Sequence, residues 1–134
     1  LKLQEEAKAV ELYKKIISCG EFGLQTSEEK AAYVCAYNNL SLLGTKNALI
    51  YIDKAIELDA KNPFLFFNKA YIYFKMKEYD KALIECDKSL SINSKIIKSY
   101  KLKAVIYTIL KNESESTKMI NYGLENFKGS HSDF

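Results

Sequence analysis

Residues 63–96 decide the fold, and they read PFLFFNKAYIYFKMKEYDKALIECDKSLSINSKI. Asn62, just before this stretch, is a good helix N-cap, and Pro63 suits the first helical position because its fixed φ is already helical. A first helix is expected from there to about Met76, and a second over about residues 79–92, with a short polar turn between them. The stretch therefore predicts a helix–turn–helix hairpin.

The same pattern recurs along the chain at a period of 34 residues. Residues 29–62, 63–96 and 97–130 align without gaps. Small residues stand at the same places of these segments: Ala36, Ala70 and Ala104 at the eighth, Ala48, Ala82 and Ser116 at the twentieth, and Ala55, Ser89 and Gly123 at the twenty-seventh. Because small residues let neighbouring helices approach closely, this period predicts a stack of helical hairpins.

The residues on either side of the three segments extend this organisation. Thr26 and Glu29 have the spacing of a capping box at the start of the first segment. Residues 3–18 are helical in pattern, with the spacing expected for the second helix of an earlier repeat. The expected divisions are an N-terminal helix and loop at 1–28, three repeat units over 29–130 (29–62, 63–96 and 97–130), and a tail at 131–134.

The last hairpin is expected to keep one side partly uncovered. No polar capping helix is expected after residue 130, which leaves Met119, Ile120, Leu124 and Phe127 partly unmatched. The chain begins with Leu1 and not with Met, so we expect it to be part of a longer protein. The uncovered side would then meet further repeats, a partner or a second copy.

Composition places the chain among ordinary globular proteins, with 48% hydrophobic and 28% charged residues. No apolar run approaches the roughly 18 residues of a membrane-spanning helix, so no membrane insertion is expected. The three isolated cysteines, Cys19, Cys35 and Cys86, argue against a disulfide framework and favour a reducing compartment, for which we expect the cytoplasm. Each is expected to be buried or half-buried.

The charged and nucleophilic residues do not point to catalysis or to nucleic acid. No nucleophile–base set, glycine-rich phosphate loop or paired-carboxylate motif is present, so we expect no enzyme, no cofactor and no metal site. The net charge is only +3, and all 20 basic residues are Lys. A binding site for nucleic acid is therefore not expected, although RNA binding through Lys and Tyr stays open as an alternative hypothesis.

Residues 29–130 resemble the tetratricopeptide repeat family, most closely at Ala-Ile-Glu-Leu-Asp (55–59) and Tyr-Asp-Lys-Ala-Leu (79–83). Ala32 departs from the pattern, no glycine stands at the eighth place, and the closing proline is absent from every segment. The resemblance implies an all-α fold: a right-handed α-solenoid of helix–turn–helix hairpins, with about three repeats plus an N-terminal helix.

The resemblance also implies a peptide-binding groove on the concave side, lined by the first helices of successive repeats. The residues expected there are Tyr33, Tyr37, Phe67, Asn68, Tyr71, Phe74, Lys98 and Lys101. The first part of the groove is aromatic and the last part basic, since no acidic residue lies between Asp87 and Glu113. Two plainer interpretations stay open: the aromatic rings pack between helices, and the lysines form a solvated face.

Some members of the family clamp the C-terminal carboxylates of cytosolic heat-shock chaperones. Asn68 and Lys98 fall at two of the five clamp places, whereas Tyr33, Tyr37 and Leu102 replace the polar residues at the other three. We therefore expect a peptide site, but not the standard chaperone clamp.

The expected function is that of a protein–protein interaction module, adaptor or co-chaperone-like, that holds a partner peptide in the groove. The partner would be another protein or peptide, acidic or a C-terminal tail. The alternative is a structural assembly subunit, which forms a homo-oligomer or stacks on further repeats through its ends.

Overall fold

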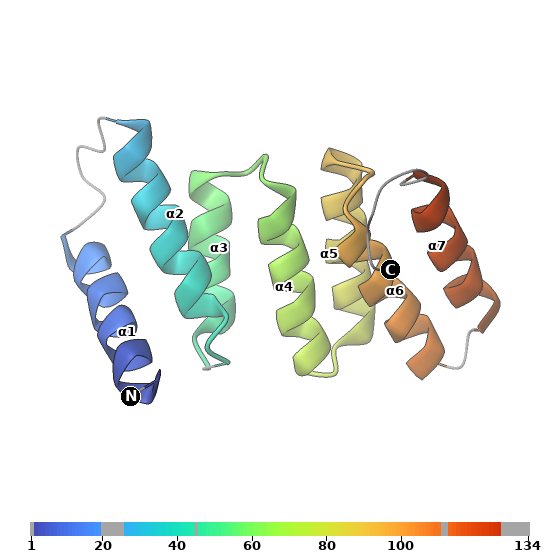
Figure 1. Cartoon of the computed structure of the whole chain (residues 1–134), viewed down its shortest axis with the longest axis horizontal. Coiled ribbons are helices and arrows are strands. Elements are labelled where there is room, and N and C mark those ends of the chain that lie inside the picture. Colours follow the sequence, from blue (N-terminus) through green and yellow to red (C-terminus); the bar gives the residue numbers. More distant parts are fainter. Residues whose placement is uncertain (1, 20–25, 45, 111–112, 127–134) are drawn as a thin grey trace. The chain divides into compact units, whose positions relative to one another are not determined.

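The computed structural model describes residues 2–19, 26–44, 46–110 and 113–126, which form helices and turns with no strand among them (Figure 1). The helices in these ranges are α1 (Lys2–Ser18), α2 (Ser27–Ser41), α3 (Ala48–Leu58), α4 (Pro63–Lys75), α5 (Tyr79–Ile92), α6 (Ile97–Ile109) and α7 (Glu113–Asn126). The expectation of an all-α fold of helical hairpins is confirmed.

The helices group into two compact units. Unit 1 comprises residues 1–60 and contains α1, α2 and α3; unit 2 comprises residues 61–134 and contains α4 to α7. Each unit is described by itself below. The finer division into three repeats of 34 residues stays a prediction, although α2 with α3, α4 with α5 and α6 with α7 each form a packed pair.

In unit 1, α2 packs against both α1 and α3. The capping box is present at the start of α2: the Glu29 amide donates to Thr26 Oγ1 at 3.1 Å, and the Thr26 amide donates to a Glu29 carboxylate oxygen at 3.3 Å. Between α1 and α2, the Asn39 amide nitrogen donates to the Tyr13 hydroxyl at 3.0 Å. Local capping thus begins α2 where the sequence predicts it.

The core of unit 1 lies between α2 and α3. The fully or almost fully buried side chains there include Ala36, Leu40, Ala48, Ile52 and Ala55. Helix α1 contributes no fully buried residue and covers α2 with half-buried side chains only. Burying the small residues at the predicted places lets the two helices approach closely.

In unit 2, α4 begins at Pro63 as predicted, with the Phe64 amide donating to the Asn62 side-chain oxygen at 3.0 Å. The turn into α5 places Lys77 at φ 63°, in the left-handed region. Helix α5 then covers the predicted residues 79–92. Its core with α4 and α6 is formed by Ala70, Ala82, Cys86, Leu102 and Ile106.

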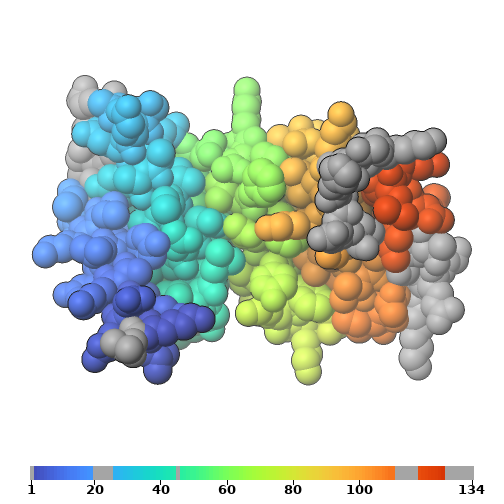
Figure 2. Space-filling view, viewed as in Figure 1, coloured from blue at the N-terminus to red at the C-terminus, as the bar shows by residue number. Residues whose placement is uncertain are grey.

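Helices α5 and α6 meet through small polar residues. Ser89 and Ser99 are fully buried, and their hydroxyl oxygens lie 2.8 Å apart in a hydrogen bond. Farther along α6, the Tyr100 hydroxyl donates to the Ser94 carbonyl at 2.7 Å, and its ring lies 5.3 Å from that of Tyr122 on α7. In the space-filling view, the atoms of residues 63–109 form a continuous surface on the side shown (Figure 2).

The prediction that all three cysteines are buried or half-buried is wrong for two of them. Cys86 is buried in unit 2, but Cys19 and Cys35 are exposed. The buried residues of α2 fall on one side of the helix, and at about 100° per residue Cys35 points to the opposite side. Cys19 follows the end of α1, which buries none of its own residues.

The prediction of an uncovered last helix holds where the structure describes it. Ile120 and Leu124 on α7 are exposed and Met119 is half-buried. Phe127 and the tail at 131–134 lie outside the described residues.

Candidate functional site

Three aromatic rings form a continuous ladder along α4. Phe67 and Tyr71 stack with ring centroids 6.4 Å apart at 21°, and Tyr71 and Phe74 stack at 6.1 Å and 23°. Their spacing of four and three residues places them on one side of the helix. The ladder therefore presents a preformed aromatic surface and not three independent rings.

The outer rings of the ladder are anchored and the middle one faces solvent. Phe67 and Phe74 pack against the core cluster that contains Leu102 of α6, and Phe74 also meets Tyr79 edge-on at 5.9 Å. Tyr71 keeps 37% of its surface exposed. An aromatic ring fixed between two neighbours loses little conformational entropy when a partner covers it.

A lysine already occupies one face of the exposed ring. The Lys75 ammonium lies 5.1 Å from the Tyr71 centroid, within the range of a cation–π interaction. Lys75 is itself exposed, so this contact is accessible to solvent. An acidic group that approaches Tyr71 would meet this ammonium as well.

Helix α6 packs on α4, shares its core cluster and carries further lysines. Lys98 and Lys101 are both exposed. Lys98 forms no ion pair with the residues that the structure describes. The same helix exposes Val105 and Ile109, so its outer side offers positive charge together with apolar surface. We call the residues Phe67, Asn68, Tyr71, Phe74, Lys98 and Lys101 the α4–α6 face.

Two other lysines of the acid-free stretch are already neutralised. The Lys103 ammonium donates to the Asp87 carboxylate, and Lys103 is buried. The Lys88 ammonium lies 3.0 Å from the Glu85 carboxylate. Among the described residues, the exposed Lys98 therefore carries positive charge that is available to a ligand, whereas Lys88 and Lys103 do not.

Glu85 is a buried carboxylate of unit 2. It is only 4% exposed, and its Oε1 lies 3.7 Å from the Lys69 ammonium as well as 3.0 Å from that of Lys88. Its Oε2 accepts no hydrogen bond from the described residues. Two lysines, Lys69 on α4 and Lys88 on α5, thus compensate one buried carboxylate.

The predicted residues of unit 1 are placed differently from those of unit 2. Tyr33 is 7% exposed and Tyr37 is 6% exposed. Their rings lie 6.5 Å apart, and Tyr37 also lies 6.4 Å from Tyr51 on α3. Both rings are core residues of unit 1 in this structure. In unit 2, Asn68 is half-buried and Leu102 is buried.

Two groups with shifted pKa values are poor candidates for chemistry. Burial raises the pKa of the Cys86 thiol to about 12, a rise that the nearby Lys103 ammonium opposes only in part. Burial and the neighbouring Tyr122 raise the pKa of Tyr100 to about 12. Both groups stay neutral near pH 7, which suits packing and not nucleophilic attack.

The described part of the chain contains neither a candidate metal site nor a membrane-spanning helix. In it, no group of three or more His, Cys, Asp or Glu side chains is placed to hold a metal ion. None of its helices is both long enough and apolar enough to cross a membrane. The α4–α6 face is therefore the main candidate site of unit 2.

A family comparison identifies the repeat. The tetratricopeptide repeat family profile matches residues 51–84, which run from α3 through α4 into α5. The chain therefore contains a tetratricopeptide repeat. This repeat makes it a protein-interaction module.

Two curated relatives contain similar repeats. The Protein STIP1 homolog of Dictyostelium discoideum is 33% identical over 67 residues, which cover 50% of this tetratricopeptide repeat chain and 12% of the relative. Stress-induced-phosphoprotein 1 of Caenorhabditis elegans is 29% identical over 89 residues, which cover 66% of this chain and 28% of the relative. The chain thus spans less than a third of either relative.

Two solved structures share the fold. The crystal structure of MamA has a TM-score of 0.69 at 22% identity, over 87% of this chain and 66% of that one. The first tetratricopeptide repeat domain of Spaghetti (RPAP3), bound to the HSP90 peptide SRMEEVD, has a TM-score of 0.65 at 23% identity, over 79% of this chain and 88% of that one. At these identities the likeness shows the fold alone.

Several features of unit 2 were not predicted from the sequence. The pairing of Lys75 with Tyr71 has a readable signal, since residues four apart in a helix are neighbours. The pairing of Lys69 with Glu85 joins two helices and leaves no such signal. The exposure of Val105 and Ile109 also depends on how α6 is turned against its neighbours.

Proposed function

We propose that the chain is an adaptor or co-chaperone-like module that binds an acidic peptide of a partner protein on the α4–α6 face. The observation that carries this proposal is the ring of Tyr71, exposed between two anchored rings, on a helix that packs against one carrying exposed lysines. Rings supply contact area, and ammonium groups attract carboxylates.

Two further observations support an acidic ligand. Lys98 and Lys101 are exposed on α6, and no acidic residue lies near them in the sequence between Asp87 and Glu113. The structurally similar RPAP3 domain is bound to SRMEEVD, a peptide with three acidic residues. The burial of Tyr33 and Tyr37 in unit 1 favours a site formed mainly by unit 2. A cytoplasmic setting is part of the proposal, since the three cysteines are free.

The test is a screen of the purified chain against acidic-ended, apolar and chaperone-tail peptides, including SRMEEVD, at low and high salt. Binding should be strongest for acidic peptides and weaken as salt screens the lysines. Lys98→Ala combined with Lys101→Ala should weaken binding by about tenfold or more, because two charge-assisted contacts are lost.

The matched control is Lys8→Ala combined with Lys54→Ala, which removes the same charge from exposed positions of unit 1. It should leave the affinity within about twofold of the parent chain, because neither lysine belongs to the α4–α6 face. If both double variants bind with the parent affinity, the α4–α6 face is not the acidic-peptide site.

The alternative, a structural assembly subunit, has one specific observation in its favour. Helix α7 exposes Ile120 and Leu124, which lie four residues apart and so share one side of the helix as apolar surface. Analytical ultracentrifugation over micromolar concentrations would distinguish the two functions. A stable dimer that binds none of the peptides would favour assembly over peptide binding.

A further inference from the structure

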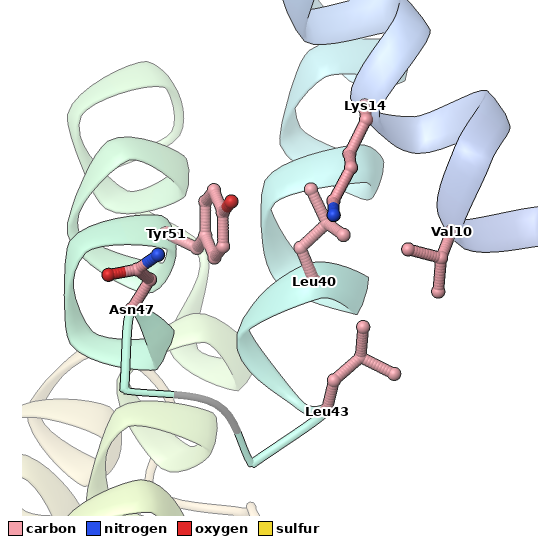
Figure 3. Close-up of a pocket in the computed structure, with 6 residues that line it drawn as sticks. All are labelled: Val10, Lys14, Leu40, Leu43, Asn47 and Tyr51. Carbon is pink, nitrogen blue, oxygen red and sulfur yellow. The ribbon is translucent and has the colours of Figure 1, made fainter. Parts of the chain in front are cut away.

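A depression lies in unit 1, on different elements from the α4–α6 face. Its volume is about 160 Å³. The residues that line it come from α1, from α2 and the turn that follows, and from the start of α3 (Figure 3): Val10, Lys14, Leu40, Leu43, Asn47 and Tyr51. An apolar cavity of about 150 Å³ holds a benzene ring, so this depression has room for one apolar side chain.

The lining is mainly apolar and is held in place. Leu40 is only 1% exposed and forms the closed side of the depression, whereas Leu43 is 50% exposed and lies at its open side. Val10 contributes a third aliphatic wall from α1. The ring of Tyr51 contacts that of Tyr37 at 6.4 Å, which fixes its orientation. The depression is thus a formed site and does not depend on a change of the core.

Two polar groups at the depression lack partners. Lys14 is exposed, and with the residues that the structure describes its ammonium forms no ion pair and donates no hydrogen bond. Asn47 precedes α3 as its N-cap residue, but its side chain makes no capping hydrogen bond. Figure 3 shows the Lys14 side chain extending from α1 toward Leu40. An apolar ligand group placed there would have a positive charge beside it.

We propose that this depression binds an apolar side chain of leucine size from a partner protein, next to an aspartate or glutamate in the partner sequence. The apolar group contacts Val10, Leu40 and Leu43, and the neighbouring carboxylate pairs with Lys14. The commitment to a carboxylate follows from charge complementarity, since the ammonium has no acidic partner in the described part of unit 1. The site goes beyond the proposed function, because it uses no residue of the α4–α6 face.

The contact is expected to be weak by itself. A single buried side chain and one solvent-exposed ion pair give a dissociation constant in about the millimolar range. Such a site adds selectivity and avidity to a longer partner and is not sufficient alone. Nuclear magnetic resonance detects binding of this strength and reports its location.

The experiment titrates the ¹⁵N-labelled full chain with the capped peptide acetyl-Gly-Ser-Leu-Glu-Gly-Ser-amide, which has no terminal charge. We expect the largest amide shifts at Val10, Lys14, Leu43 and Asn47. Replacing the peptide's Leu by Ala should weaken binding by about tenfold or more, because two or three methyl or methylene groups lose their contacts. Replacing its Glu by Gln should weaken binding by about fivefold.

Variants of the chain complete the test. Lys14→Gln should weaken binding of the Glu peptide by about fivefold and leave binding of the Gln peptide unchanged. The effects of the substitution in the chain and of that in the peptide are then not additive. Lys15→Gln removes a neighbouring charge of α1. Because Lys15 does not line the depression, this substitution should change the affinity for neither peptide. Lys98→Ala with Lys101→Ala should also change neither, which separates this site from the α4–α6 face.

Three results would each overturn the proposal. The first is the absence of shifts at the highest soluble peptide concentration. The second is a set of shifts centred outside the depression. The third is equal affinity for the Glu and Gln peptides, which would remove the role assigned to Lys14. Unchanged far-UV circular dichroism of each variant shows that a lost contact does not reflect a lost fold.

Discussion

Tyr33 and Tyr37 in unit 1 stand at the fifth and ninth places of the segment 29–62, and Phe67 and Tyr71 stand at the same places of the segment 63–96. The two tyrosines of unit 1 are almost fully buried, whereas Tyr71 keeps more than a third of its surface exposed. The same residue type at the same place of a repeat thus serves as core in one unit and as surface in the other. A repeat register assigns a residue to a side of its helix, but neighbouring helices decide whether that side stays open.

The ion pairs of the two units differ in the same way. In unit 1, Lys54 and Glu57 lie 3.5 Å apart on α3, with 47% and 69% of their side chains exposed. In unit 2, the Glu85 side chain is only 5% exposed and lies beside Lys69 and Lys88. The exposed pair contributes little to stability, whereas the buried carboxylate depends on its lysines.

The largest loss of stability should come from removing the aromatic ring at the ninth place of a 34-residue segment. Tyr37→Ala should lower the free energy of unfolding by about 3 kcal/mol, because a buried aromatic ring leaves a cavity. Tyr71→Ala should cost about 1 kcal/mol, since its ring is partly exposed and mainly stacks on its neighbours. Urea denaturation followed by circular dichroism measures both, with Tyr37→Phe and Tyr71→Phe as controls. Equal losses for the two alanine variants would remove the distinction between core and surface.

An intermediate effect is expected for the buried carboxylate. Glu85→Gln should cost about 1 kcal/mol, because the amide cannot balance the two lysines beside it. Glu57→Gln changes the same groups in the exposed pair and should cost less than about 0.5 kcal/mol. The comparison uses denaturation curves at low and high salt. A loss for Glu57→Gln as large as that for Glu85→Gln would contradict the assignment of Glu85 as a structural charge.

The turns should show two effects of opposite sign, and that of Lys77→Gly should be the smallest change in stability. Gly44 in unit 1 has φ 74° and Lys77 in unit 2 has φ 63°. Gly44→Ala should cost about 1 kcal/mol through backbone strain alone, since an added Cβ meets no atom within 4 Å. Lys77→Gly should relieve such strain and stabilise by up to about 0.5 kcal/mol, because the greater freedom of the unfolded chain offsets part of the gain. Differential scanning calorimetry resolves the opposite signs, and a destabilised Lys77→Gly would show that the Lys77 side chain contributes contacts of its own.

Much of the fold was predictable because its signals are local. The Thr26–Glu29 capping box, the Asn62–Pro63 helix start and the bounds of α5 all depend on residues a few positions apart. The small residues at the repeated places, such as Ala70 and Ala82, are buried as the period predicts. For the predicted site, the sequence could assign each residue to a side of its helix. It could not predict how far each residue is buried.

The sequence by itself determined the helices, their caps, their pairing into hairpins and the positions at which helices approach closely. Only the tertiary structure decided that Tyr37 is buried while Tyr71 is exposed, and that Cys35 faces outward. It also decided that Lys103 pairs with Asp87. It also brought Lys14 and Leu43 to one depression. The physical reason is that hydrogen bonds and capping act over three or four residues, whereas burial and charge pairing depend on helices that meet from distant parts of the chain.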